Sequence, residues 1–443
     1  MAEHRRGANL PSIGGFNRTV VLDAVRRSPD GLSRVELASR TGLSAQTVSN
    51  VTRFLIEAGM IVESGTVVAG RGKPRTILRL EPGSRYAVGV HVDPAVVTYV
   101  LLDLAGTVVA SSTTSTPTAD DPSEVVRTIG SAVDGLIADA GVDVDGVLGV
   151  GIASPGPIDV DAGIVVDPPF LPRWRDVPLR DALAEATGYP VLLEKDVTAA
   201  AVGEMFLAGE SSARNFAFVY FGTGFGVGLV VDHEPVRGVG SNAGDAGHIM
   251  VDQRSLAGTP DGSGTRGEVG AAVAPDRLVR IARERGVALS GGGGDAAAGA
   301  VSSGRAAVPG GAAASDGSVP SDGSVDAVNR AWDELAEAIA AGDEAAITLA
   351  AEAGTVMGDA AVVIVNLLDI DRVVFGGPFW SRIASAALPA ARAAIVGSPL
   401  LVPKHAVDVV ESDRGADVAA VGAACLVLDA ALSPRASGLL IRR

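Results

Sequence analysis

Beyond Arg85 the chain alternates short apolar stretches, bounded by glycine or proline, with longer helical stretches. FAFVYFGTGFGVGLVVDHEPV (216–236) predicts a strand, a glycine loop and a second strand, and VLLEKDVTAAAVGEMFLAG (191–209) predicts a short buried strand followed by a helix. Strands that alternate with helices are buried beneath them, which is typical of an α/β fold. We therefore expect residues 83–443 to form a two-lobed α/β body with a cleft.

Residues 1–82 follow a different pattern, which predicts three short helices and a β-hairpin. The first helix is expected from about Arg18 to Arg27. Ser33 and Glu36 form a capping box for the second, and Ser44 caps the third. Two helices joined by a glycine turn, the second with a polar outer face, form a helix-turn-helix.

The side chains expected to contact DNA lie on this third helix and on the hairpin loop that follows it. Short polar groups on the helix suit base edges and phosphates; they are Gln46, Thr47, Ser49, Asn50 and Arg53. The loop GRGKPR crowds Arg71, Lys73 and Arg75 onto a wing that suits phosphates or a narrow minor groove. A plain three-helix domain with a solvated basic loop is the alternative.

The charge distribution separates this head from the body. The whole chain carries a net charge of −16, yet residues 1–80 hold 12 Lys and Arg against 6 Asp and Glu. The rest therefore holds 24 basic and 46 acidic residues. A basic head on an acidic body favours a DNA-contacting head, although an ordinary basic surface would look the same.

Composition sets further limits. Hydrophobic residues make up 47% of the chain but aromatic ones only 4%, so the core is expected to be aliphatic. No signal peptide or membrane span is expected, which favours the cytoplasm. A single cysteine, Cys425, excludes an internal disulfide. Residues 289–326 are of low complexity and are expected to be a disordered insertion.

Six motifs in order resemble the ROK family of repressors and sugar kinases. They are ASPGPID (153–159), LPRWRDVPL (171–179), EKDVTAAAVGE (194–204), FGTGFGVGLVV (221–231), GSNAGDAGHIMVD (240–252) and VVFGGPF (373–379). The resemblance implies a winged helix-turn-helix followed by an actin-like ATPase, sugar kinase-like body with the sugar cleft between its lobes.

Against the family's kinases, the first phosphate loop is degenerate. Where they have Asp and Gly-Gly-Thr, this chain has His91 and then Asp93, Pro94 and Ala95. Pro94 removes a donor amide and Asp93 adds a negative charge facing a polyanion. The second loop is better kept, as a vestigial nucleotide loop or a tight strand turn; its residues are Gly222, Thr223, Gly224 and Gly226. We expect no catalysis.

The resemblance also implies a zinc site built from one histidine and three cysteines. His248 matches that histidine, but the downstream segment 253–274 holds no cysteine, and Glu268 falls near the last cysteine position. One soft ligand does not make a tetrahedral zinc site. We expect no metal and no cofactor.

Sugar recognition in the family uses an Asn-Asp pair together with the Glu and His of Glu-x-Gly-His. By that resemblance the ligand-binding candidates here are Lys195, Asp196, Asp245, His248 and Gly156. Asp196 stands where the kinases have their general base. Lys195 favours an acidic or phosphorylated sugar, but it would equally pair with a neighbouring carboxylate in a pocket that no longer binds sugar.

These observations favour a cytoplasmic transcriptional regulator, a repressor, that binds an operator as a homodimer or homotetramer and senses a sugar or sugar-derived effector without phosphorylating it. Two alternatives stay open. One is an ATP-dependent sugar kinase that retains a DNA-binding head, and the other is a DNA-binding protein whose body binds no ligand.

Overall fold

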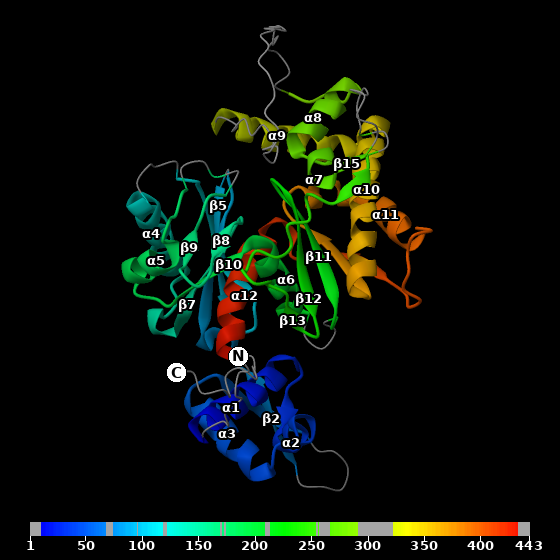
Figure 1. Cartoon of the computed structure of the whole chain (residues 1–443). Coiled ribbons are helices and arrows are strands. Elements are labelled where there is room, and N and C mark those ends of the chain that lie inside the picture. Colours follow the sequence, from blue (N-terminus) through cyan, green and yellow to red (C-terminus); the bar gives the residue numbers. More distant parts are fainter. Residues whose placement is uncertain are drawn as a thin grey trace, which may run out of the picture.

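The computed structural model of the chain is a small head attached to a larger two-lobed body (Figure 1). It describes residues 10–67, 74–94, 96–117, 122–168, 171, 174–208, 213–253, 256, 266–290 and 322–432.

The head contains three helices and a three-stranded antiparallel sheet. They are α1 (Leu10–Arg26), β1 (Leu32–Ser33), α2 (Arg34–Thr41), α3 (Ala45–Glu57), β2 (Ile61–Val67) and β3 (Arg75–Leu80), with strand order β1-β3-β2. The predicted caps are confirmed: Ser33 and Glu36 form a capping box, and the Ser44 hydroxyl accepts the amide of Thr47. Gly42 closes α2 in a left-handed conformation, so α2 and α3 are joined by a tight turn.

Two predicted boundaries differ from the structure. The first helix begins at Leu10, not at Arg18. Pro11 is compatible with this start, because the backbone amides of a first helical turn make no hydrogen bond within the helix and proline therefore loses none. Most of the expected insertion lies outside the described residues. Its last part, 322–326, was wrongly predicted as disordered and forms the start of a helix that buries Trp332; once nucleated by packing, a helix extends at little cost.

The first lobe is built on a five-stranded sheet. Its elements are β4 (Tyr86–Val92), β5 (Val96–Asp103), β6 (Val108–Ser115), α4 (Pro122–Ala140), β7 (Val147–Ser154), β8 (Ile158–Asp159), β9 (Ile164–Val165), α5 (Leu179–Thr187), β10 (Val191–Lys195) and α6 (Asp196–Leu207). The order is β6-β5-β4-β7-β10, and α4 and α5 cover one face.

The second lobe repeats this plan. Its elements are β11 (Phe216–Phe221), β12 (Phe225–Val231), β13 (Glu234–Pro235), β14 (Met250–Asp252), β15 (Arg266–Glu268), α7 (Val269–Ala272), α8 (Pro275–Glu284), α9 (Asp322–Ala340), α10 (Glu344–Leu368), β16 (Arg372–Gly376), α11 (Trp380–Val396), β17 (Asp408–Glu411) and α12 (Val418–Leu432). The main sheet has the order β13-β12-β11-β16-β17. In both lobes three antiparallel strands are followed by two parallel ones.

Helices α6 and α12 lie between the two sheets (Figure 1). Apart from Asp196, Thr198, Glu204 and Asp429, both are built from apolar residues and glycine and have no polar face, as expected of buried helices. They approach closely because Gly203 faces Gly422; a Cβ at Gly203 would lie 2.8 Å from the Cα of Gly422. A Cβ at Gly422 would overlap the carbonyl oxygen of Ala199. The two lobes therefore share one helical layer.

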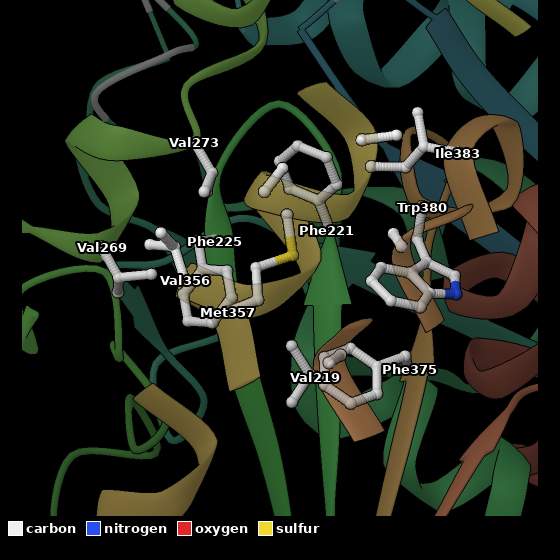
Figure 2. Close-up of a cluster of buried hydrophobic side chains, with 14 of the residues drawn as sticks. Val219, Phe221, Phe225, Val269, Val273, Val356, Met357, Phe375, Trp380 and Ile383 are labelled. Carbon is white, nitrogen blue, oxygen red and sulfur yellow. The ribbon is translucent and has the colours of Figure 1, made fainter. Parts of the chain in front are cut away.

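The outer core of the second lobe fills the space between its sheet, α10 and α11. Figure 2 shows aromatic residues of this core, with Phe375 stacked on Trp380 at a centroid distance of 4.5 Å. Two helical segments, Glu344–Leu368 and Gly415–Leu432, are long and apolar enough to cross a membrane, but 61% and 72% of their most apolar windows are buried inside the protein.

We predict that Gly422→Ala destabilises the protein by about 1–3 kcal/mol, because the added methyl group overlaps backbone that cannot rotate away. Gly135→Ala is the control: it lies within α4 with no atom within 4 Å of the added Cβ, and should stabilise by about 0.5–1 kcal/mol. Urea unfolding measures both. Equal stability of the two variants would contradict the close helix contact.

Candidate functional site

A cavity of about 370 Å³ lies where α6 begins, between the two lobes. It brings together most of the predicted ligand and loop positions, which line it as Asp93, Pro94, Gly156, Lys195, Asp196, Thr223, Gly224, Gly226 and Asp245. The lining also includes Tyr220 and Asn242. Ala95 lies outside the described residues.

The N-terminus of α6 positions two of these side chains. Strand β10 ends at Lys195, and Asp196 opens the helix, where its carboxylate accepts the amide of Val197 at 2.7 Å. An acidic group in a first helical turn is favoured by the helix dipole. Burial nevertheless raises the pKa of Asp196, while the nearby His91 acts in the opposite direction. This carboxyl therefore lies at a rigid, partly desolvated position suited to hydrogen-bond a ligand hydroxyl.

Lys195 is buried, and its ammonium donates to the main-chain oxygen of Asn242 at 3.2 Å. The Asn242 side chain in turn bonds both the amide and the carbonyl of Ile158, at 2.8 and 2.7 Å. Asn242 thus ties the Gly156 loop of one lobe to the 240–245 loop of the other. Nothing in the sequence singles it out, since an asparagine in a glycine-rich segment is typical of a turn.

Beside this pair, Glu194 is buried and accepts from Arg237 at 2.6 Å. A carboxylate in the interior is stable only when paired, so this bond holds Arg237 against the end of β10, next to Lys195. The sequence signal was present in Glu194, a charge within a short apolar strand, but its partner lies 43 residues away in the chain.

The two phosphate-loop positions contact each other across the cleft. Thr223, in the turn between β11 and β12, donates its hydroxyl to the Asp93 carboxylate at 3.0 Å. Asp93 lies in the turn between β4 and β5, the corresponding turn of the first lobe. The hydroxyl of the second phosphate loop is therefore bonded to a carboxylate of the first.

Tyr220 fills the space behind this contact. Its ring packs so closely on Gly222 that a Cβ there would lie 2.8 Å from it, and its edge meets the His91 ring at a centroid distance of 6.3 Å. Its buried hydroxyl has no hydrogen-bond partner in the described part of the chain. Burial, with Asp196 and Asp93 nearby, raises the pKa of Tyr220 well above its usual value. The sequence did not predict this residue at the site.

His248 does not line the cavity. Its side chain is 72% exposed, and its Nδ1 lies 3.1 Å from Glu268 on the neighbouring strand β15. The only cysteine of the chain, Cys425, is buried on α12, where burial raises its pKa to about 12. An exposed histidine beside a carboxylate, with the thiol buried elsewhere, does not fit a tetrahedral zinc site.

The predicted DNA-contacting face lies on α3. Gln46, Asn50 and Arg53 are exposed, and Thr47 and Ser49 are partly exposed. On the opposite side Val48, Val51 and Leu55 are buried, as expected, while Ile56 is partly buried. Arg75 is exposed at the start of β3; Arg71 and Lys73 lie outside the described residues.

Comparisons with known proteins follow the same division of the chain. A profile of the ROK family matches residues 87–430, and a profile of winged helix-turn-helix DNA-binding domains matches residues 21–62. The chain is 28% identical over 246 residues to the xylose repressor of Bacillus subtilis, covering 55% of this chain and 63% of the repressor. It is 31% identical over 200 residues to a glucokinase of Halalkalibacterium halodurans, covering 45% and 60%.

The matches thus span less than two thirds of either relative. Among solved structures, a ROK family transcriptional regulator, described as a homologue of the E. coli Mlc protein, superimposes with a TM-score of 0.67 at 20% identity. That match covers 95% of this chain and 98% of the regulator. At this identity the superposition shows a shared fold, including the head.

We predict that the pKa of His248 lies above its usual value of about 6.5, because its hydrogen bond to Glu268 favours the protonated ring. The pair then stabilises the fold below about pH 6.5, and this contribution is lost as the pH rises through the raised pKa. An NMR titration of Glu268→Gln should show a lowered pKa, whereas Glu284→Gln on α8 should not change it. A ring that does not titrate, as in a zinc-bound histidine, would contradict this assignment.

Proposed function

The chain belongs to the ROK family, and on that basis we propose that it is a transcriptional repressor whose cleft binds a sugar without phosphorylating it. The winged helix-turn-helix profile and the exposed polar face of α3 support DNA binding. The names of relatives, among them xylose repressors, support the same class. We propose that a dimer or a dimer of dimers binds a pseudo-palindromic operator in the cytoplasm.

The observation that carries the non-catalytic assignment is the Asp93–Thr223 hydrogen bond. A nucleotide needs backbone amides and positive potential at its phosphates. Here Asp93 presents a carboxylate, Pro94 lacks an amide hydrogen, and the Tyr220 ring occupies the space against Gly222. Bringing a polyanion against Asp93 costs electrostatic free energy, and Pro94 has no amide hydrogen to offset that cost, so the cleft favours a sugar alone.

The charges of the cavity favour a neutral sugar. Lys195 by itself favours an acidic or phosphorylated one, but Asp93, Asp196 and Asp245 line the same cavity. Three carboxylates against one ammonium repel an anion, and carboxylates commonly accept hydrogen bonds from sugar hydroxyls. We propose Asp196 as the main acceptor, and we propose that the protein needs no metal or cofactor.

A sugar kinase with a DNA-binding head is the second candidate. Asp196 supports it, because this carboxyl lies at the cleft with a raised pKa, as a general base requires. The glucokinase relatives support it as well. A DNA-binding protein whose body binds no ligand is the third possibility. Measuring sugar binding and ADP release on the same protein, as described below, separates the three.

For the head, we predict that the triple variant Arg71→Ala, Lys73→Ala and Arg75→Ala binds DNA more weakly and with a flatter salt dependence. Each lost phosphate contact should reduce the slope of log K against log salt by about 0.9. The probe is a duplex selected from a random pool by the full-length chain. Lys404→Ala, an exposed cation of the body, is the control. An unchanged salt slope would argue against a wing that contacts phosphates.

For the cleft, we predict that D-glucose or D-xylose raises the melting temperature of the protein and that Asp196→Asn removes this shift. Asp161→Asn, an exposed carboxylate of the same lobe, should keep it. No ADP should form when ATP is added with either sugar. ADP release that depends on Asp196 would establish the kinase, and no shift with a broad sugar panel would favour the ligand-free body.

A further inference from the structure

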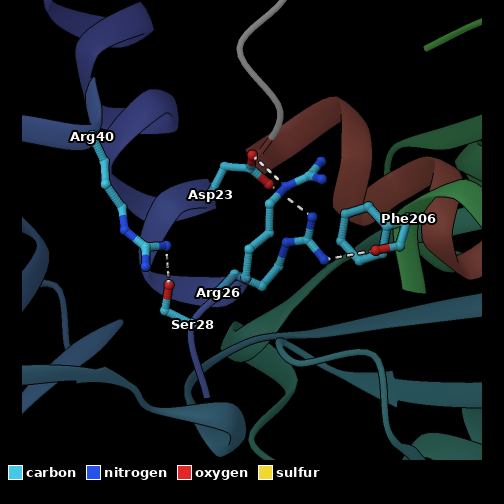
Figure 3. A network of polar contacts seen from close by, with 6 residues as sticks. Asp23, Arg26, Ser28, Arg40 and Phe206 are labelled. Carbon is cyan, nitrogen blue, oxygen red and sulfur yellow. Dashed lines mark hydrogen bonds and ion pairs between the residues drawn. The ribbon is translucent and has the colours of Figure 1, made fainter. Parts of the chain in front are cut away.

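The head is anchored to the body by Arg26, the last residue of α1. Its guanidinium donates to the main-chain oxygen of Phe206 at 2.8 Å and lies 3.8 Å from the centroid of the Phe206 ring. A second nitrogen donates to Asp23 at 2.7 Å (Figure 3). Only 5% of the arginine side chain is exposed. A planar guanidinium can stack on a ring and donate in its own plane at once, which a lysine ammonium cannot do.

Phe206 lies at the far end of the helix that begins in the cavity. Helix α6 runs from Asp196, which lines the cavity, to Leu207, next to the residue that Arg26 holds. Its 12 residues span about 18 Å. One helix therefore connects the proposed ligand site with the DNA-binding head.

This helix is tightly packed along most of its length. Residues 197 to 203 are all buried, and the glycine contact with α12 locks the two helices together. Helix α12 also packs against α1. Tightly packed interiors transmit a displacement instead of absorbing it.

The head has a second connection to the body that does not involve α6. The chain continues through Pro82–Ser84 into β4, and Arg85 donates to the main-chain oxygen of Ala58 at the end of α3, at 3.3 Å. Loss of Arg26 therefore leaves the head attached, through this connection and through the packing of α1 on α12, but removes its direct contact with Phe206 of α6.

We propose that Arg26 is the positioning residue through which the cleft controls the head: a ligand bound at Asp196 shifts α6, and Arg26 passes that shift to α1. In a dimer the two heads then change their spacing, and the affinity for the two half-sites changes with it. The inference rests on the proposed function, since it assumes a DNA-binding head and a ligand in the cleft. The coupling requires a ligand that binds the two head positions with different affinity.

Because such coupling is reciprocal, DNA bound at the head must also act on the cleft. This allows a test without a known effector. The selected DNA duplex is added to the full-length protein, and hydrogen exchange is measured at the amides of residues 194–200. In the wild type we expect the duplex to change these exchange rates. In Arg26→Ala we expect the duplex to bind within about threefold of the wild-type affinity but to leave residues 194–200 unchanged.

Arg18→Ala is the matched control. Arg18 lies on the same helix and stacks on a phenylalanine in the same way, 3.9 Å from the Phe54 ring, but that contact stays within the head. This variant should keep the wild-type response. Phe206→Leu retains the carbonyl and an apolar side chain and removes only the ring, so it should show a reduced response. It keeps the test decisive if Arg26→Ala fails to fold.

The outcomes separate the two proposals. If no duplex is selected, DNA binding fails and the relay with it. If the duplex binds and residues 194–200 respond in Arg26→Ala as they do in the wild type, or do so in Phe206→Leu where Arg26→Ala does not fold, the relay is wrong while the regulator stands. The same holds if the duplex binds and these residues do not respond in the wild type.

Discussion

The fold depends on the close seating of α6 and α12 between two sheets. Glycines make this possible on both sides: a Cβ at Gly89 or Gly151 would overlap carbonyl oxygens of α12, and a Cβ at Gly228 would overlap that of Val197 on α6. Because neither helix has a polar face to turn to solvent, both lobes must close over the pair. The closure places the first turn of α6 at the junction of the lobes, where the cavity forms.

The repeated strand order explains why two distant turns meet there. The β4–β5 and β11–β12 turns occupy equivalent positions in the two lobes, and the lobes face each other across the shared helices. In a phosphate-binding member of such a fold both turns would offer amides to a polyanion. Here they bond to each other through Asp93 and Thr223. The same architecture thus forms a cleft in which the two turns bond to each other. This cleft lies at one end of α6, and the other end of α6 contacts the head.

Much of this could be predicted from local sequence. The caps at Ser33 and Ser44, the strands on either side of the 222–224 loop, and the order of head and body all follow from patterns within a few residues. The family resemblance placed four residues in one cavity, and they do lie together there: Gly156, Lys195, Asp196 and Asp245. His248 was predicted to line the same cavity but lies outside it, beside Glu268. Glu268 belongs to strand β15, whose pairing with β14 the local sequence does not define.

The sequence by itself determined the class of each segment, because capping, periodicity and charge act over short distances along the chain. The tertiary structure alone decided which of these segments meet. The Arg237–Glu194 pair, the Thr223–Asp93 hydrogen bond and the Arg26 contact with Phe206 join residues from different elements, each pair more than forty positions apart. Such contacts form only when the two sheets close over α6 and α12, and no short stretch of sequence contains both partners and the packing that brings them together.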